Sequence, residues 1–489
     1  MNETTTRLSS TLNENENLIK TLLPSEDVLS YRFQTSDKVN CTLFYADGMV
    51  NKELLGELIA RPISALDLKK VQNGETLITT TARFPELKIV TKLTDILKEV
   101  LDGNTLLLVD GFSVGFIVGA KLLPVRAVSE PPTDIVVKGS REGFIEDIKT
   151  NMALIRKRLK TPALRFETVR VGKQSDTAVA LCYLKGTANE QIKDEILQKL
   201  NGVSIDNIPD SSYISALLSP RPHSFFRTVG TTEKPDIFSA KLAEGRIGII
   251  VDGSPIALTV PYLLTEDFQA SEDYFVSPFN ATIYRLLRFI SLFVAVLLPA
   301  FYVSAQLFKL QLVPLGLVLT IASSVRELPF SPALEMFVVL FLLETLKDAS
   351  IRMPKYVGMS LSVVGALVLG ETAVSAGFLS TPAILIVAFS GICLYTVPNF
   401  VETGSILRWL FLLVAGSLGP FGIVLLSVLL LLYLISADAF QTPLLAPFSP
   451  LIKSDLKDSI VKYDMLALDK RPRIFQSPNK TRLRVNKKK

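Results

Sequence analysis

The pattern of apolar and polar positions divides the chain into two halves. From 284 to 437 the sequence is almost continuously apolar, whereas the preceding residues mix apolar and polar positions as a water-soluble protein does. Residues 289–308 carry no charged side chain and have the length that a helix needs to cross about 30 Å of hydrocarbon. We therefore predict an integral membrane protein with a large soluble region before its membrane domain. The predicted spans are 289–308, 333–346, 356–371, 382–397, 405–418 and 420–437.

The apolar stretch 312–325 is left over from this count of six spans. It is only fourteen residues long and is bordered by Pro314 and Pro329. We expect a re-entrant or interfacial segment, because irregular backbone at membrane depth needs shielding by protein or a water-filled cavity. If this stretch spans the membrane instead, one terminus changes sides.

Positive charges set the predicted orientation. Arg285 and Arg288 precede the first span, the connection 347–355 carries three Lys or Arg, and the tail from Lys453 onward has twelve Lys or Arg against four Asp. Such residues favour the cytoplasmic side of a membrane, where anionic lipids attract them. The N-terminus is polar and acidic and does not resemble a signal peptide. Both termini are therefore predicted to be cytosolic, although the tail also fits a solvated, disordered end.

Two sequence markers repeat in the soluble half. The pattern Tyr-x-x-Gly-x-x-Asn occurs at 45–51 and again at 183–189, each time between a strand-like run and a helical run. Downstream, an apolar run that ends in Val-Asp-Gly occurs at 103–111 and at 245–253. Two markers in the same order and at similar spacing predict an internal duplication. Each Asp-Gly pair lies between apolar runs and predicts a β-hairpin.

These patterns predict a fold class and its divisions. The fold class is a membrane protein in which a cytosolic α+β region of two subdomains precedes a polytopic α-helical transmembrane domain. A Pro-Pro step at 131–132 separates the two subdomains. The predicted divisions are a disordered N-terminus at 1–20, subdomains at 21–130 and 135–275, the transmembrane domain at 284–437 and a basic cytosolic tail at 438–489.

The sequence offers little for catalysis or metal binding. His223 is the only histidine, and Cys41, Cys182 and Cys393 show no metal-ligand spacing. The loop at 139–143 has glycines but neither the P-loop Lys-Ser/Thr nor the GxGxxG spacing. We expect no enzyme, no cofactor and no metal site. Nucleic acid is not an expected partner, because the basic tail shows no recognisable nucleic-acid-binding fold.

The stretch 356–371 carries a seam of small residues. Gly358, Ser362, Ala366 and Gly370 recur every four positions, which lets helices approach closely. Such a seam serves packing inside one subunit or contact between subunits, and the sequence leaves both alternatives open.

A second stripe lies on another side of the same stretch. It consists of Ser360, Val364, Leu367 and Glu371. Repeated around an oligomer axis, these side chains would give a polar ring, a hydrophobic constriction able to dewet, and an acidic outer mouth that favours cations. We therefore take this stripe as the candidate pore lining.

Four further ionisable residues lie at membrane depth: Arg326, Glu327, Glu335 and Glu344. Charges there are costly and usually face the protein interior or a water path. A gating role and an ion pair of Arg326 with Glu327 or Glu335 that only fixes the fold are both open. Glu344 is expected to form an ordinary helix-surface pair with Lys347.

Several stretches between 130 and 450 carry a family resemblance. They are VKGSREGF (137–144), TNMALIRKRLKTP (150–162), DSSYI (210–214), EGRIGIIVDGSP (244–255), SEDYFVSPFNATIYRLLRF (271–289), RELPF (326–330), GMSLSVVGALVLGETAV (358–374) and LLAPFSP (444–450). Together they resemble the A subunit of spore germinant receptors, the membrane complexes by which dormant bacterial endospores detect nutrients. The first 130 residues match only loosely. The chain also reads RELPFSP where the family usually reads REGVPFP, so a glycine is lost.

The resemblance implies partners and a role. An A subunit is expected to join a permease-like B subunit, which holds the nutrient, and a lipoprotein C subunit. Its copies are expected to form a homo-oligomeric, nutrient-gated cation channel in the spore inner membrane. The alternative from the residues alone is a secondary transporter or lipid-handling permease with a cytosolic regulatory domain, since broken spans and buried carboxylates also serve transport. The membrane half shows no internal repeat, which favours the channel.

Overall fold

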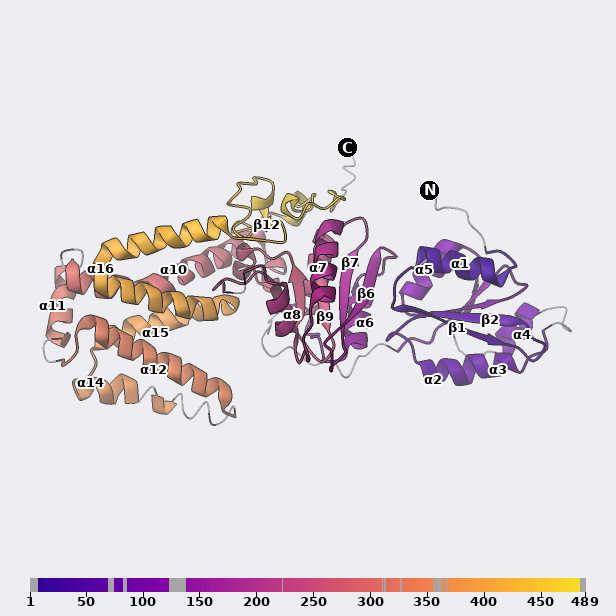
Figure 1. Cartoon of the computed structure of the whole chain (residues 1–489), viewed down its shortest axis with the longest axis horizontal. Helices are drawn as coiled ribbons and strands as arrows, with labels where there is room; N and C mark the ends of the chain where they lie inside the picture. Colours follow the sequence, from indigo (N-terminus) through magenta and orange to yellow (C-terminus); the bar gives the residue numbers. More distant parts are fainter. Residues whose placement is uncertain are drawn as a thin grey trace.

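The computed structural model shows two sheet units followed by a group of helices, arranged in a row (Figure 1). We call these parts the first unit, the second unit and the helical part. The structure describes residues 8–68, 74–81, 86–122, 138–221, 223–309, 311, 314–325, 328–354, 357, 363–365 and 368–483.

The first unit is a five-stranded antiparallel sheet with helices on both faces. Its strand order is β1-β2-β4-β5-β3. Leu12, Ile19 and Ile96 bury one face, and Ile59 and Ile63 bury the other. The elements are α1 (Leu12–Leu22), β1 (Val28–Gln34), β2 (Asn40–Ala46), α2 (Lys52–Leu55), the π-helical turn η1 (Gly56–Ala60), α3 (Arg61–Ser64), α4 (Gly74–Thr81), β3 (Leu87–Val90), α5 (Leu93–Leu101), β4 (Thr105–Val109) and β5 (Gly115–Val118).

The second unit repeats this plan element for element. Its strand order is β6-β7-β9-β10-β8, which is the order of the first unit, and the predicted duplication is confirmed. The elements are α6 (Ile148–Arg158), β6 (Leu164–Val171), β7 (Thr177–Leu184), α7 (Glu190–Gly202), α8 (Ser211–Leu218), β8 (Gly230–Thr232), α9 (Pro235–Glu244), β9 (Ile247–Val251) and β10 (Ala257–Val260).

The repeated Tyr-x-x-Gly-x-x-Asn pattern is a strand-to-helix turn. Gly48 and Gly186 have positive φ angles of 75° and 76°, which favour glycine. Asn51 and Asn189 cap the helices that follow, their side-chain oxygens accepting backbone N–H groups of the first turn. The pattern therefore recurs because both units turn the chain in the same way.

Both Asp-Gly pairs lie in the predicted hairpins. β4 pairs with β5 and β9 pairs with β10, in each case antiparallel. The two aspartates also have a role that the sequence did not indicate. Asp110 accepts the Leu12 N–H at 3.0 Å, and Asp252 accepts the Ile148 N–H at 3.3 Å. Each hairpin therefore supplies a carboxylate to the start of the first helix of its unit, where an acceptor is needed.

The expected disorder of the N-terminus is wrong for residues 8–20. This segment contains most of α1, and Leu8, Leu12 and Ile19 are buried in the first unit. The segment looks polar because its apolar residues are few, but they share one face of a helix and that face is covered.

The helical part contains two helices that are long and apolar enough to cross a membrane, Pro278–Phe308 and Pro398–Ser436. The stretch 312–325, predicted to be re-entrant or interfacial, contains a short helix, and the stretch 356–371 lies mostly outside the described residues. The elements are α10 (Pro278–Phe308), α11 (Leu315–Val325), α12 (Pro332–Arg352), the π-helical turn η5 (Val368–Thr372), α14 (Ala373–Ser375), α15 (Thr381–Tyr395), the 3-10 turn η6 (Pro398–Phe400) and α16 (Val401–Ser436).

Helix α16 reverses direction at Gly419, which has the non-helical angles φ 65° and ψ −146° and is followed by proline. Near one end of α16, Thr403 Oγ1 donates to the Phe225 carbonyl at 2.6 Å; near the other, the Tyr433 hydroxyl donates to Ser224 Oγ at 2.8 Å. A straight helix of this length would extend about 54 Å. Both ends reach the same loop only because the helix folds back, as the predicted break between 405–418 and 420–437 requires.

The described part of the C-terminal tail, which ends at 483, packs against the rest of the chain, so a wholly solvated end is ruled out for these residues. A short hairpin, β11 (Asp438–Ala439) and β12 (Thr442–Pro443), begins it. Ile474 and Phe475 are buried, and the Ser477 hydroxyl donates to the Thr187 carbonyl at 2.7 Å. The tail therefore packs against the second unit, beside which Figure 1 shows the C-terminus.

Candidate functional site

The structure describes five of the twelve candidate membrane residues: Val364, Gly370, Glu371, Glu335 and Glu344. The predicted seam and stripe are therefore described only in part. Seven candidates lie outside the described residues: Ser360, Leu367, Gly358, Ser362, Ala366, Arg326 and Glu327.

Val364 and Glu371 both lie on the surface of the chain. Val364 is 53% exposed, and Glu371 is exposed within the π-helical turn η5. The segment packs against α12, because a side chain at Gly365 would meet Leu346 at 3.1 Å. Within the described part of the chain, Glu371 has no hydrogen bond or ion pair. Gly370 likewise faces open space. This surface of the chain is therefore available to lipid, water or another subunit.

Glu335 is a buried link between two helices. Its side chain has no exposed surface, and one carboxylate oxygen accepts the Ser380 N–H at 2.5 Å. Ser380 is the N-cap of α15, and its own hydroxyl accepts the Ala383 N–H. Glu335 therefore joins the start of α12 to the start of α15.

Glu344 forms the expected helix-surface ion pair with Lys347, at 3.2 Å, and also contacts other helices. Its carboxylate also accepts Arg408 of α16 at 2.5 Å. The fully buried Arg408 donates to Ser390 Oγ at 3.0 Å, and Ser390 donates to the Ala295 carbonyl at 2.6 Å. This polar chain connects α12, α16, α15 and α10. A lone arginine inside the apolar run 405–418 was the available sign of it.

A cavity of about 1200 Å³ lies between the second unit and the ends of the helices. Lys241 and Glu266 line it from the second unit and the segment that follows. Lys347 and Tyr395 line it from the C-terminal ends of α12 and α15, and Glu402 from the start of α16. We call it the junction cavity. Its lining thus comes from the second unit, from the segment that follows it and from α10, α12, α15 and α16.

Two neighbouring carboxyl groups of the junction cavity have pKa values shifted in opposite directions. Burial opposes the charge of Glu266, but Arg246 and Lys241 outweigh it and hold its pKa below the usual range. Lys241 lies 2.8 Å from the Glu266 carboxylate. Burial raises the pKa of Asp267 to about 6, and a hydrogen bond with Tyr262 offsets this only in part. The cavity therefore holds one carboxylate that stays ionised and one that titrates near neutrality.

A cluster of charges anchors α10 beside this cavity. The buried Arg285 donates from Nε to Asp273 at 3.1 Å and from its terminal nitrogen to Asp458 at 2.9 Å. Arg288 also contacts Asp273, at 2.8 Å. Asp273 precedes the membrane helices, and Asp458 belongs to the tail. The two arginines that predicted orientation therefore also join three segments of the chain.

Comparison with known proteins places this architecture in a family. The model described as "Bacillus/Clostridium GerA spore germination protein" matches residues 16–474. Spore germination protein KA of Bacillus subtilis is 31% identical over 94% of this chain and 85% of its own length. Spore germination protein B1 of the same organism is 30% identical over 94% of this chain and 96% of its own length.

Two further proteins are similar to this chain in sequence. The uncharacterized membrane protein YfkQ of Bacillus subtilis is 32% identical over 96% of this chain and 93% of its own length. The N-terminal domain of the A subunit of the Bacillus megaterium spore germinant receptor GerK3 is 29% identical, with a TM-score of 0.43, over 53% of this chain and 98% of that domain. The chain therefore belongs to the GerA family of spore germination proteins.

Proposed function

We propose that this chain is the A subunit of a nutrient-sensing germinant receptor. Several copies surround an ion path and form a nutrient-gated cation channel in the spore inner membrane, whose opening initiates germination. A permease-like B subunit and a lipoprotein C subunit complete the receptor. The chain acts without catalysis and without a cofactor.

The channel proposal rests on the exposed position of Glu371. Its carboxylate is exposed at the end of an apolar stretch and has no partner within the described residues. A charge in that position is costly against lipid and needs water or a polar partner. Copies arranged around an axis would place it in water, at the mouth of a pore. The exposed Val364 on the same segment would form the constriction below it.

The arrangement of the chain supports six spans with both termini cytosolic. The described ends of the chain both lie on the side of the sheet units (Figure 1). The reversal of α16 at Gly419 supplies two antiparallel arms from one continuous helix. Together with α10, α12, α15 and the predicted span 356–371, these two arms would account for the six proposed passes, and α11 lies between α10 and α12 in the chain.

Recordings from the receptor in planar bilayers test the proposal. Nutrient should evoke unitary current steps. Val364→Ala should leak without nutrient, because a hydrophobic gate depends on bulk, whereas Glu371→Gln should keep gating and lose cation selectivity or conductance. Saturable flux without unitary steps would favour the alternative, a secondary transporter or lipid-handling permease. A tightly closed Val364→Ala receptor together with normal selectivity in Glu371→Gln would remove this segment from the pore.

A further inference from the structure

Strand β1 is an edge of the first sheet, and part of its backbone faces outward. The Thr35 N–H donates to the Val39 carbonyl beside the β1–β2 turn. Because hydrogen-bonded pairs alternate along an antiparallel ladder, the N–H groups of Ser30 and Arg32 point away from β2. Within the described part of the chain, neither N–H has an acceptor. The edge is therefore available for pairing.

The same edge of the second unit is already occupied by the chain itself. The Phe166 N–H of β6 donates to Ser25 Oγ at 3.2 Å, and the Thr168 N–H donates to the Glu26 carboxylate at 2.6 Å. Ser25 and Glu26 belong to the turn that precedes β1. This arrangement shows that the fold accepts a hydroxyl and a carboxylate at its free strand edge.

A buried ion pair holds this turn in place. Arg156 of α6 donates to both carboxylate oxygens of Asp27, at 2.8 and 2.7 Å, and both side chains are buried. Asn15 and Asn151 make the same backbone contacts at the starts of α1 and α6. Five positions after each asparagine stand Lys20 and Arg156, so Lys20 is the exposed counterpart of Arg156. The first unit therefore has, at its edge strand β1, a cation in the position that Arg156 has beside β6, but there the edge is open.

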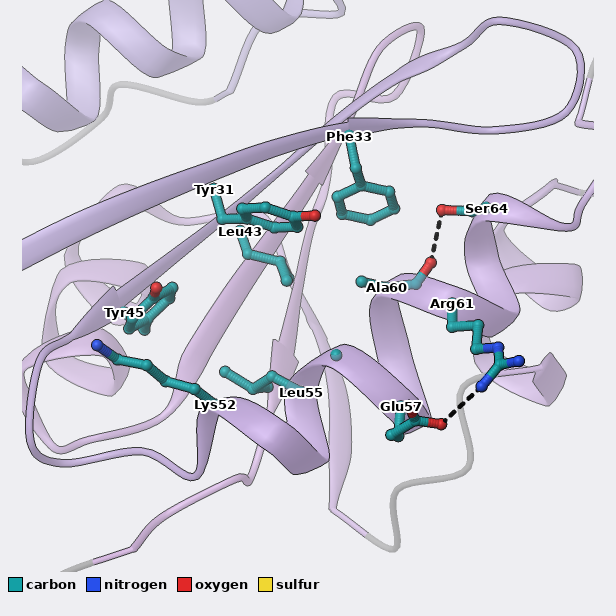
Figure 2. A pocket seen from close by; sticks show the side chains of 11 residues that line it. Tyr31, Phe33, Leu43, Tyr45, Lys52, Leu55, Glu57, Ala60, Arg61 and Ser64 are labelled. Carbon is teal, nitrogen blue, oxygen red and sulfur yellow. Dashed lines mark hydrogen bonds and ion pairs between the residues drawn. The ribbon is translucent and has the colours of Figure 1, made fainter.

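A pocket of about 570 Å³ lies on the inner face of β1 (Figure 2). The rings of Tyr31 and Phe33 stack at 6.0 Å and line it from the strand, and Tyr31 is 52% exposed. Leu55 forms part of its floor, and Lys52 and Arg61 line it from the facing helices. The pocket therefore combines an aromatic, apolar lining with a charged rim.

The backbone explains why the first unit has this pocket. The facing helix is interrupted by the π-helical turn η1, Gly56–Ala60, whereas the corresponding α7 is a regular helix. Such turns insert a residue and often mark functional sites. In the second unit Tyr183 and Glu167 take the places of Tyr45 and Tyr31, and there the tyrosine hydroxyl hydrogen-bonds the carboxylate.

We propose that β1 is a docking edge for an extended segment of a partner polypeptide other than this chain. The segment pairs with the N–H groups of Ser30 and Arg32 and inserts an apolar or aromatic side chain into the pocket beside Tyr31. An acidic side chain of the segment meets Lys20, as Asp27 meets Arg156. Strand addition with side-chain pockets is an established mode of peptide recognition, in which the backbone gives affinity and the pocket gives specificity.

Hydrogen exchange tests the docking edge in the receptor as it exists. In native membranes the amides of Ser30 and Arg32 should exchange at least about tenfold more slowly than in the chain purified alone. The amides of Phe166 and Thr168 should be protected in both samples, because their acceptors belong to the chain. Equal exchange of the β1 amides in the two samples would overturn the proposal.

Photo-cross-linking with matched variants identifies the partner. A photoreactive residue at position 31 should give one adduct with a different polypeptide, whereas the same residue at exposed Ile89 on the opposite edge strand should not. Arg32→Pro, which removes one outward N–H at an edge where proline is tolerated, should reduce the adduct about tenfold. Arg32→Ala loses the same side chain, which contacts Asn13 and Glu16 of α1, but keeps that N–H, and it should therefore give a clearly stronger adduct than Arg32→Pro. Adducts with lipid alone or with a second copy of this chain, or equal adducts in both variants, would contradict the assignment.

Discussion

The two sheet units share one fold but use the same loops to contact different partners. In the first unit, the loops at 46–49 and 101–103 lie against α6 and the residues just after it: Lys149 of α6 is 3.3 Å from Asp47, and Lys160, two residues beyond α6, pairs with Asp102. In the second unit, the corresponding loops at 184–187 and 243–245 lie against the C-terminal tail. The tail therefore takes the position that a third unit would take.

This difference shows what a duplication preserves. The strand order, the capped turns and the hairpin carboxylates are common to both units. The outer surfaces of the two units differ. The second unit is covered by the first unit, the tail and the helical part, whereas the first unit keeps an open edge at β1. The units of an array each need their ends capped, and here an unrelated segment serves as one cap.

The largest expected effect is at the contact between the units. Arg156→Ala leaves Asp27 buried without its cation and should cost about 3–5 kcal/mol of stability, measured by denaturant unfolding. Lys20→Ala, the matched change in the first unit, should cost less than about 0.5 kcal/mol because the side chain is exposed. Similar losses in the two variants would mean that the corresponding positions do not differ as the structure indicates.

Substitution of a buried residue in the C-terminal tail should destabilise the protein by nearly as much. Phe475 is 1% exposed, and the Arg246 guanidinium lies 4.2 Å from its ring centroid. Phe475→Ala should cost about 3 kcal/mol and expose the tail to limited proteolysis. Met465 of the same tail is 75% exposed and provides the control. The protease should cleave the Met465→Ala variant no faster than it cleaves the unchanged protein. Unaltered proteolysis of Phe475→Ala would show that the tail does not depend on this contact.

A smaller, pH-dependent effect on stability should come from Asp267, in the segment that follows the second unit. The folded protein holds the proton of Asp267 with a pKa of about 6, against 3.8 for the unperturbed group. The folded state therefore binds this proton more tightly than the unfolded state, and its stabilising effect is lost as pH rises through 6. Between pH 5 and pH 7 we expect a loss of about 1 kcal/mol. Asp267→Asn should remove this dependence in unfolding measured at both pH values; an unchanged pH profile would assign it to another group.

Removal of the equivalent helix caps should have the smallest effect on stability, and the effect should be equal in the two units. Asn51→Ala and Asn189→Ala each remove one helix cap and should each cost about 1 kcal/mol in denaturant unfolding. Substitution by Asp at either position keeps an acceptor and should cost little. A large difference between the two alanine variants would argue against equivalent turns.

The sequence predicted those features that depend on neighbours along the chain. The repeated glycine and asparagine, the Asp-Gly hairpins and the break at Gly419 are local signals, because each fixes the backbone within a few residues. The family resemblance was confirmed for the same reason: its motifs are contiguous stretches, and they extend through both halves of the chain.

Contacts between distant residues could not be predicted in the same way. Asp27 and Arg156 are 129 positions apart, and Glu344 and Arg408 are 64 apart. Nothing in the local pattern of either residue indicates its partner, so Glu344 was paired only with its neighbour Lys347. The same limit applies to the tail, whose basic composition suggested solvation although Ile474 and Phe475 are buried.

The ion pairs of Arg285 hold one end of α10, so a tilt of this helix about Arg285 would move its other end most. The residue lies near the start of a helix that continues to Phe308, and it is bonded both to the segment before the helix and to the tail. The helix beyond the anchor is about 35 Å long, so a tilt of about 5° would displace its far end by about 3 Å. The residues next to Arg285 lie close to the fixed end of the helix, so they would move far less than the end at Phe308.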